Sequence, residues 1–332
     1  MLSQRPQRLD RASQRRFGTP DASLSRFTYD GAMATRIKFT LVDVFTSRPF
    51  GGNQLAVFHD AGKLSKAQMQ SLAREMNFSE STFVISPARR ADPIRVRIFT
   101  PQREIPMAGH PTVGTTWVLA SRGQLPAGDA ALRLGIGEIK VTIEGRPRNP
   151  AFVWMAHKPA EFGEQRSDRA RIAEALGIRP DDVRADLPIQ MVSTGNPFLF
   201  IPLASTDALA RCVSSAPALL GLFDSPGKIL PVYLFVCGEA LKSGVRARMF
   251  APHTDGIVED PATGSAAAPL GAYLHAHGII GPVPRTRFKA IQGVEMGRPS
   301  RIELQVLGTG SAVRKVSVGG ECVPVMRGKL LV

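Results

Sequence analysis

Residues 251–278 read APHTDGIVEDPATGSAAAPLGAYLHAHG, and this stretch decides how the rest of the chain is interpreted. After an acidic loop, the small residues Thr263-Gly264-Ser265 open an almost wholly apolar run that stops at Gly278. Small hydroxyl residues, an apolar run and a closing glycine predict a helix with its N-cap and C′ positions marked. A helix that is apolar on nearly every face is buried. Its free first amides would point inward, where a bound anion is a natural partner.

Residues 97–123 repeat this construction. They read RIFTPQREIPMAGHPTVGTTWVLASRG, and Gly109-His110 stands where Gly264-Ser265 stands in the first stretch. The closing glycines, Gly123 and Gly278, follow at the same distance. We therefore predict two related halves, each built around one buried helix, with chance similarity of Gly-rich loops as the alternative. The other matching segments are residues 97–101 with 248–252, and residues 52–58 with 195–201.

The composition is that of a soluble globular protein. At 332 residues and 43% hydrophobic, the chain can bury a sizeable core and suits two domains. No uninterrupted apolar run approaches the thickness of a bilayer, so we expect no membrane association. The three cysteines, Cys212, Cys237 and Cys322, show no metal-binding spacing. They predict reduced thiols in a cytoplasmic protein without a metal site.

The net charge is strongly positive, at +14. A basic balance can indicate nucleic-acid binding. Here the basic residues are dispersed and only 7% of the chain is aromatic, so attraction of small anionic substrates is the better interpretation and no nucleic-acid partner is expected. The sequence contains no phosphate-binding motif GxGxxG, no P-loop and no GxSxG nucleophile elbow. It therefore lacks the usual markers of nucleotide-binding folds and of serine hydrolases.

The order of segments predicts an α+β fold in which each sheet curls about its helix. Residues 1–32 are polar and rich in Arg, Ser and Gln, which predicts a disordered N-terminal extension, with Met33 as an alternative natural start. Residues 33–149 would form the first domain and residues 150–332 the second, because residues 145–150 are rich in turn formers. Residues 66–76 predict an amphipathic helix with a Ser65/Gln68 capping box.

The predicted helix starts indicate a chemistry. Two helix N-termini that face one another across a cleft would bind a substrate carboxylate through backbone amides. Glu80, His110, Asp260 and Ser265 are polar residues of the right kinds to stand beside it. A carboxyl group in a cleft that excludes water has a raised pKa and becomes a general acid or base near neutral pH. This combination suits removal and return of a proton next to a carboxyl group or diene, without a metal or organic cofactor.

Each of these residues also has a purely structural interpretation. Glu80 fits a solvated position at a strand edge, and Asp260 before Pro261 fits a turn or a helix start. His110 and Ser265 fit helix N-caps, and Asn53 fits a turn. Only the repeat, which gives His110 and Ser265 matching positions, raises the functional interpretation above these.

Five segments carry a resemblance to a known family. They are DVFTSRPFGGNQLAVF (43–58), NFSESTFV (77–84), AGHPTVGT (108–115), GIVEDPATGSA (256–266) and QGVEMGRPS (292–300). In this order they resemble the PhzF-like phenazine-biosynthesis isomerases, from about Ile37 to the C-terminus. The resemblance implies the diaminopimelate-epimerase-like fold: two pseudo-symmetric β-barrel-like domains, each wrapped around a central helix, with the active site between them. It also allows the last strand to return to the first barrel.

The resemblance implies a mechanism as well. Members of the family that make phenazines isomerise trans-2,3-dihydro-3-hydroxyanthranilate without a cofactor, by moving a proton along the diene. Glu80 would carry that proton, while His110 and Asp260 would position the hydroxyl and amino groups. The family is often dimeric, so a homodimer is expected. The residues expected to bind the substrate, a small carboxylate, are Asn53, Ser79, Gly109, Gly264 and Ser265, with the amide of His110.

Three alternatives stay open. The same fold houses epimerases and racemases with a cysteine at each helix start, but here these places hold Gly109-His110 and Gly264-Ser265. An epimerase or racemase would therefore need a base other than a thiol. A non-catalytic protein that binds small carboxylates would keep the same cleft, and a basic nucleic-acid-associated protein is the weakest candidate. The polar triplet His253-Thr254-Asp255 leaves the size and charge of the substrate open.

Overall fold

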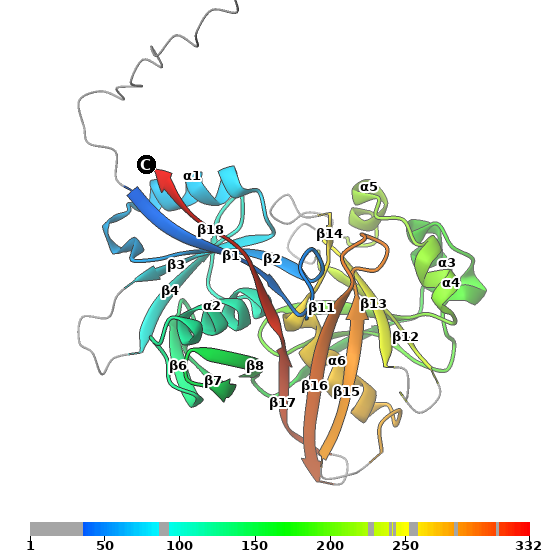
Figure 1. Cartoon of the computed structure of the whole chain (residues 1–332). Helices are drawn as coiled ribbons and strands as arrows, with labels where there is room; N and C mark the ends of the chain where they lie inside the picture. Colours follow the sequence, from blue (N-terminus) through cyan, green and yellow to red (C-terminus); the bar gives the residue numbers. More distant parts are fainter. Residues whose placement is uncertain are drawn as a thin grey trace, which may run out of the picture. The chain divides into compact units, whose positions relative to one another are not determined.

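The computed structural model describes residues 36–85, 93–224, 229–238, 241, 244–251, 258–281, 285–309 and 312–332. The predicted N-terminal extension and the triplet His253-Thr254-Asp255 lie outside these described residues. Within them the fold is a mixture of helices and strands (Figure 1). The 18 strands of the described residues are hydrogen-bonded into one sheet. No helix in the described segments combines the length and the apolarity needed to cross a bilayer.

In the first run of elements, the helix predicted over residues 66–76 is present with these bounds. The predicted capping box is present, because the Gln68 amide donates to the Ser65 hydroxyl and the Ser65 amide donates to the Gln68 side chain. The elements are β1 Arg36–Val44, β2 Asn53–Phe58, the 3-10 turn η1 Ala61–Lys63, α1 Lys66–Met76, β3 Glu80–Ile85, β4 Ile94–Phe99, β5 Glu104–Ile105, α2 Gly109–Ser121, β6 Gly128–Leu134, β7 Gly137–Arg146 and β8 Asn149–Ala156.

The second run is longer, and its last strands have eight to ten residues. The elements are β9 Glu161–Arg166, α3 Arg169–Leu176, the 3-10 turn η2 Pro180–Asp182, β10 Ile189–Ser193, β11 Pro197–Pro202, α4 Thr206–Arg211, α5 Ala216–Leu220, β12 Val232–Cys237, β13 Val245–Phe250, β14 Glu259–Asp260, α6 Gly264–Ala276, β15 Arg285–Gln292, β16 Ser300–Thr309, β17 Ala312–Gly320 and β18 Cys322–Leu331.

The strand pairing repeats along the chain, as the sequence repeat predicts. In the first copy β1–β2 pair antiparallel, β2–β3 parallel, β3–β4 and β4–β5 antiparallel, β4–β6 parallel, and β6–β7 and β7–β8 antiparallel. The pairs from β10–β11 to β16–β17 have the same order and orientations. The β8–β17 pair joins the two copies, and β18 returns to lie antiparallel beside β1. Closure into two barrels stays a prediction, as does the boundary between residues 149 and 150, which falls at the start of β8.

Each copy of the repeat contains one buried helix. Helix α2 packs on β1, β2, β3, β7 and β8, and helix α6 packs on β10, β11, β16 and β17. Apart from Trp117 and Ser121 in α2 and Ala276 in α6, every residue of both helices is buried. The closing glycines have the left-handed φ that ends a helix, 74° at Gly123 and 73° at Gly278. The prediction of two buried helices is therefore confirmed.

The N-cap interpretation of His110 and Ser265 is wrong. Both are the second residue of their helix, and the N-caps are Ala108 and Thr263. Neither N-cap side chain accepts a hydrogen bond from its helix. Each helix begins earlier than predicted, at a glycine, Gly109 or Gly264. Because glycine has no side chain, the starts of the two helices can lie in contact.

Candidate active site

The starts of α2 and α6 lie in direct contact. A Cβ atom on Gly109 would lie 2.8 Å from the amide nitrogen of Ser265 and 3.0 Å from the carbonyl carbon of Gly264. No side chain fits between the helices at such distances, so the backbone amides of two helix N-termini gather at one place. The first amides of a helix have no partner within the helix, and together with the helix dipole they favour an anion.

This contact gives a first prediction, the effect of Gly109→Ala. The added methyl group must push the two helix starts apart, which is expected to destabilise the protein by about 1–3 kcal/mol and to weaken carboxylate binding. Gly62→Ala is the control, because its Cβ would meet only Ile85, at an ordinary 3.8 Å. Thermal unfolding and ligand titration of both variants test this. Equal melting temperature and affinity in Gly109→Ala and wild type would contradict it.

A cavity of about 370 Å³ opens at these helix starts. Most of the predicted site residues line it: Glu80, Gly109, His110, Asp260, Gly264 and Ser265. The other two, Asn53 and Ser79, are not among its lining residues but hydrogen-bond to Asp260. The structure thus brings all the predicted residues together. Six of them line the cavity, and Asn53 and Ser79 contact Asp260 instead.

Asp260 is a carboxyl group of this cavity that three side-chain donors hold in place. One of its oxygens accepts from the Asn53 amide at 2.7 Å and the Ser79 hydroxyl at 2.9 Å, and the other accepts from the Thr263 hydroxyl at 2.6 Å. Burial nevertheless raises the pKa of Asp260 to about 6, against the lowering effect of these three donors, and the nearby charge of Glu259 raises it further. Asp260 therefore changes its protonation state close to neutral pH.

His110 and Glu80 form the second pair. The Nδ1 atom of His110 lies 3.5 Å from Glu80 Oε2 and 3.1 Å from the Asn53 amide nitrogen. Burial lowers the pKa of His110 to about 3, although a backbone hydrogen bond with Gln54 opposes this. The imidazole is therefore neutral at pH 7, and its contact with Glu80 is polar rather than an ion pair. Its buried Nε2 has no hydrogen-bond partner among the described residues, which leaves it for a bound molecule to satisfy.

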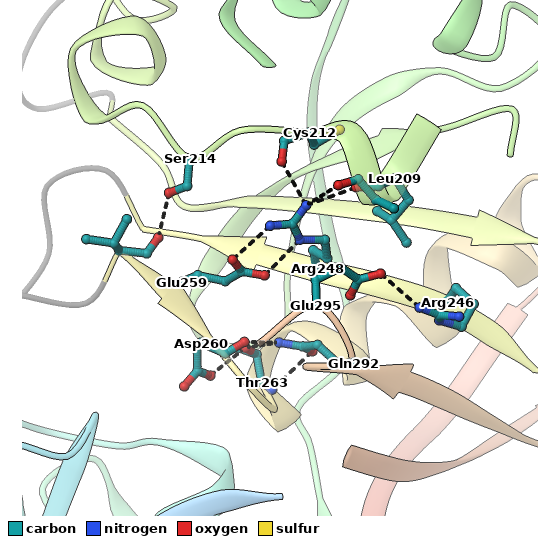
Figure 2. A network of polar contacts seen from close by, with 12 residues as sticks. Leu209, Cys212, Ser214, Arg246, Arg248, Glu259, Asp260, Thr263, Gln292 and Glu295 are labelled. Atoms are coloured by element: carbon teal, nitrogen blue, oxygen red, sulfur yellow. Dashed lines mark hydrogen bonds and ion pairs between the residues drawn. The ribbon is translucent and has the colours of Figure 1, made fainter. Parts of the chain in front are cut away.

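The sequence did not reveal how Asp260 is fixed. The fully buried Gln292 donates to the Asp260 carbonyl at 2.7 Å and the Thr263 hydroxyl at 2.9 Å, and it accepts from the Thr263 amide (Figure 2). Gln292 begins the QGVE segment of the family resemblance, and that was the available signal. Arg298 from the same segment donates to the carbonyls of Gly51 and Gly52, the residues that precede Asn53.

No group of three or more His, Cys, Asp or Glu side chains in the described residues is arranged to hold a metal ion. The three cysteines, Cys212, Cys237 and Cys322, are not among the residues that line the cavity. A pair of catalytic thiols at the helix starts is thus contradicted by the residues that stand there.

Comparison with known proteins identifies the family. A sequence profile described as phenazine biosynthesis-like protein, PhzC–PhzF, matches residues 42–328. The chain belongs to the PhzC–PhzF family. It is 35% identical to the trans-2,3-dihydro-3-hydroxyanthranilate isomerase of Pseudomonas aeruginosa over 292 residues, which cover 88% of this chain and 98% of that protein.

Two solved structures resemble this chain over most of its length. A PhzF-family phenazine biosynthesis protein of Bacillus anthracis matches 90% of this chain and 100% of its own, with a TM-score of 0.79 and 25% identity. A predicted epimerase of P. aeruginosa matches the same shares with a TM-score of 0.73 and 32% identity. The predicted family and the isomerase class are confirmed, while the substrate stays open.

Proposed function

We propose that this PhzC–PhzF protein is a cofactor-independent isomerase that moves a proton by general acid–base catalysis on a small carboxylate. The observation that carries the proposal is the cluster in front of the two helix starts. Glu80 contacts His110, and Asn53 bonds to both His110 and Asp260, so the three ionisable side chains form one connected group. A substrate similar to trans-2,3-dihydro-3-hydroxyanthranilate, which gives its name to the relative, fits this arrangement.

The substrate carboxylate would bind at the helix starts. The amides of Gly109, His110 and Gly264, with the Ser265 hydroxyl, offer donors where both helix dipoles favour negative charge. Charge that develops on the substrate during proton transfer is stabilised by the same preorganised donors. Binding and catalysis would therefore share one set of groups.

Glu80 is the residue we assign to carry the proton. Its side chain is 13% exposed and lies beside a neutral imidazole, so it is largely shielded from water. Neutral His110 and the poised Asp260 would hold the hydroxyl and amino groups of the substrate. A carboxyl group that takes a proton from one carbon and returns it to another needs no further reactant.

The alternative of an epimerase rests on the named relative of known structure. Inversion of a carbon centre by two bases needs one base on each side of that carbon, so the second base must lie apart from the first. Among the described residues that line the cavity, Glu80, His110 and Asp260 are the only acid–base groups apart from Arg103, and they are connected with one another. The geometry therefore favours one proton carrier over two opposed bases.

The test is turnover of trans-2,3-dihydro-3-hydroxyanthranilate by purified protein dialysed against a chelator, followed by proton NMR. The expected result is catalytic rearrangement of the diene without added metal or cofactor. Inversion of an α-carbon in a panel of amino acids, without diene rearrangement, would favour the epimerase. Thermal stabilisation by carboxylates without any change in them would favour a binding protein.

The proposal extends to the assembly. We propose that the two repeated strand sets close as barrels around α2 and α6, with the cavity between them, and that two chains form a homodimer in the cytoplasm. The strand repeat and the contact between the helix starts support the first part. Light scattering on the protein as it elutes from a column measures its mass and so tests the homodimer.

A further inference from the structure

The side-chain amide of Gln292 is held at both ends by backbone groups. Its oxygen accepts from the Thr263 amide at 3.2 Å, and its nitrogen donates to the Asp260 carbonyl at 2.7 Å (Figure 2). A backbone N–H can only donate and a backbone carbonyl can only accept, so the amide cannot turn over without breaking both bonds. The Tyr233 hydroxyl donates to the same oxygen at 3.3 Å. The orientation of Gln292, which is fully buried, is therefore fixed.

The second hydrogen of this amide fixes the Thr263 hydroxyl in turn. It is donated to Thr263 Oγ1 at 2.9 Å, and the same Oγ1 lies 2.6 Å from Asp260 Oδ2. A hydroxyl has one hydrogen, and the amide nitrogen of Gln292 cannot accept it. The hydrogen of the Thr263 hydroxyl is therefore directed to Asp260, at a distance typical of a bond to a carboxylate. We call these three residues, joined by the two bonds, the Gln292 relay.

The Thr263 side chain does not have the usual role of its position. Thr263 is the N-cap residue of α6, where a threonine side chain normally accepts a hydrogen bond from an amide of the first helical turn. It makes no such bond here. Its hydroxyl serves the buried carboxyl group of Asp260 instead of the helix.

The first copy of the strand repeat has apolar residues at the three matching places. Strand register and position at the helix start match Ile105 with Asp260, Ala108 with Thr263, and Leu134 with Gln292. Ala108 and Leu134 belong to the hydrophobic core, and Ile105 packs against it. The same junction of strands and helix therefore folds without a relay in the first copy. The fold alone does not require the polar residues of the second.

The donors that contact the carboxyl oxygens of Asp260 are neutral, namely Asn53, Ser79 and Thr263. Hydrogen bonds to a carboxylate favour its ionised form, whereas burial favours the protonated form. The Ser79 hydroxyl is partly exposed and can turn towards water, but the Thr263 hydroxyl is held in place. The other ionisable groups near this carboxyl are Glu259, which is paired with Arg248, Tyr233 on β12, and Glu80 and His110, which reach it through Asn53.

We propose that Gln292 is a positioning residue that fixes the Thr263 hydroxyl as a donor to Asp260, and so keeps this buried carboxylate ionised and oriented for the reaction. The inference rests on the proposed function for its catalytic meaning, in which the carboxylate accepts a hydrogen bond from the amino group of the substrate. Its physical content is the effect of the relay on the titration of Asp260. That titration is measurable without a substrate.

The experiment uses Thr263→Val, Thr263→Ser, Gln292→Met and the double variant of Thr263→Val with Gln292→Met, all in the full chain. Valine removes the hydroxyl and keeps the shape, serine keeps the hydroxyl, and methionine removes the amide at a similar length. Thr116→Val is the control, because it also removes one buried hydroxyl, which donates to the Thr112 carbonyl in α2 away from the cavity. Carbon-13 NMR of labelled aspartate follows the Asp260 carboxyl group, assigned by its loss in Asp260→Asn.

Loss of a donor to the ionised form is expected to move the Asp260 titration to higher pH, by about half a pH unit or more in Thr263→Val. Thr263→Ser and Thr116→Val should titrate as the wild type does. Gln292→Met should shift the titration in the same direction as Thr263→Val, and the double variant should match Thr263→Val, because Gln292 acts through Thr263. An unchanged titration in Thr263→Val, or single shifts that add in the double variant, would overturn the inference.

Turnover of trans-2,3-dihydro-3-hydroxyanthranilate separates the inference from the proposed function. The acidic limb of kcat/KM against pH should move to higher pH with the titration in Thr263→Val and stay in place in Thr263→Ser. A structural role would lower the melting temperature without moving this limb, so a shifted titration with an unmoved limb would overturn the role in the reaction. Shifted titrations without turnover by the wild type would uphold the relay and count against the proposed function.

Discussion

Replacement of Glu80 by glutamine is expected to lower turnover by about 10³-fold, within the range that general acid–base catalysis contributes, while affinity for the substrate stays near wild type. Glutamine has the same shape but cannot carry a proton. The fold should persist, because Glu80 enters β3 through backbone pairing in register with Leu55, and the side chain is not needed for that. Single-turnover kinetics and calorimetric titration measure the two quantities separately.

Glu75→Gln is the control for this experiment. Glu75 lies only five positions upstream, is exposed on α1 and does not line the cavity. The same chemical change there should leave turnover and binding unchanged. Wild-type turnover in Glu80→Gln would remove Glu80 from the mechanism, and a parallel loss of affinity would mean that it binds the substrate rather than carries a proton.

The second large effect concerns stability. Asp260→Asn is expected to stabilise the protein at pH 7 by about 2–3 kcal/mol, because the buried carboxyl has a pKa of about 6 in place of 3.8 and must ionise at a cost. A group with a raised pKa in the fold gives stability below its unfolded pKa and loses it as the pH rises. The variant should therefore match wild type near pH 4 and exceed it increasingly up to pH 6 and above.

Asp43→Asn should have the opposite sign. Asp43 is as buried as Asp260, but its oxygens bind Arg298 at 2.7 Å and the Phe50 amide at 2.7 Å. Its replacement leaves Arg298, whose side chain is only 20% exposed, without its counter-charge, which is destabilising. Thermal unfolding of both variants between pH 4 and 8 provides the measurement. A loss of stability in Asp260→Asn at pH 7 would show that the three donors outweigh the burial of its charge.

Much of the fold could be predicted from local patterns. The capping box at Ser65, the apolar runs and the closing glycines fix α1, α2 and α6, because each signal acts within a few residues. The helix starts could not be placed, since they depend on the contact between Gly109 and Gly264, which lie far apart in the sequence. A prediction from residue spacing considers one helix at a time and cannot include its contact with another helix.

The site, like the fold, could be predicted only in part from the sequence. The repeat and the family resemblance indicated which residues gather, and the structure places them around one cavity. The role of Asn53 was not predictable, because its hydrogen bond to Asp260 spans 207 positions of sequence. The role of Gln292 depends likewise on a hydrogen bond between residues 32 positions apart in the sequence. The family resemblance marks Gln292 as a residue of interest, but its contacts could not be predicted from it.

The most direct test of the proposed mechanism is proton NMR of the protein with trans-2,3-dihydro-3-hydroxyanthranilate in D₂O. A single carboxyl that removes and returns a proton exchanges with solvent, so we predict deuterium at carbon in the rearranged product of the wild type. Glu80→Gln should give neither rearrangement nor deuterium. Binding of the compound, seen as shifted protein resonances, without deuterium entry or diene rearrangement in the wild type would contradict proton transfer in this cavity.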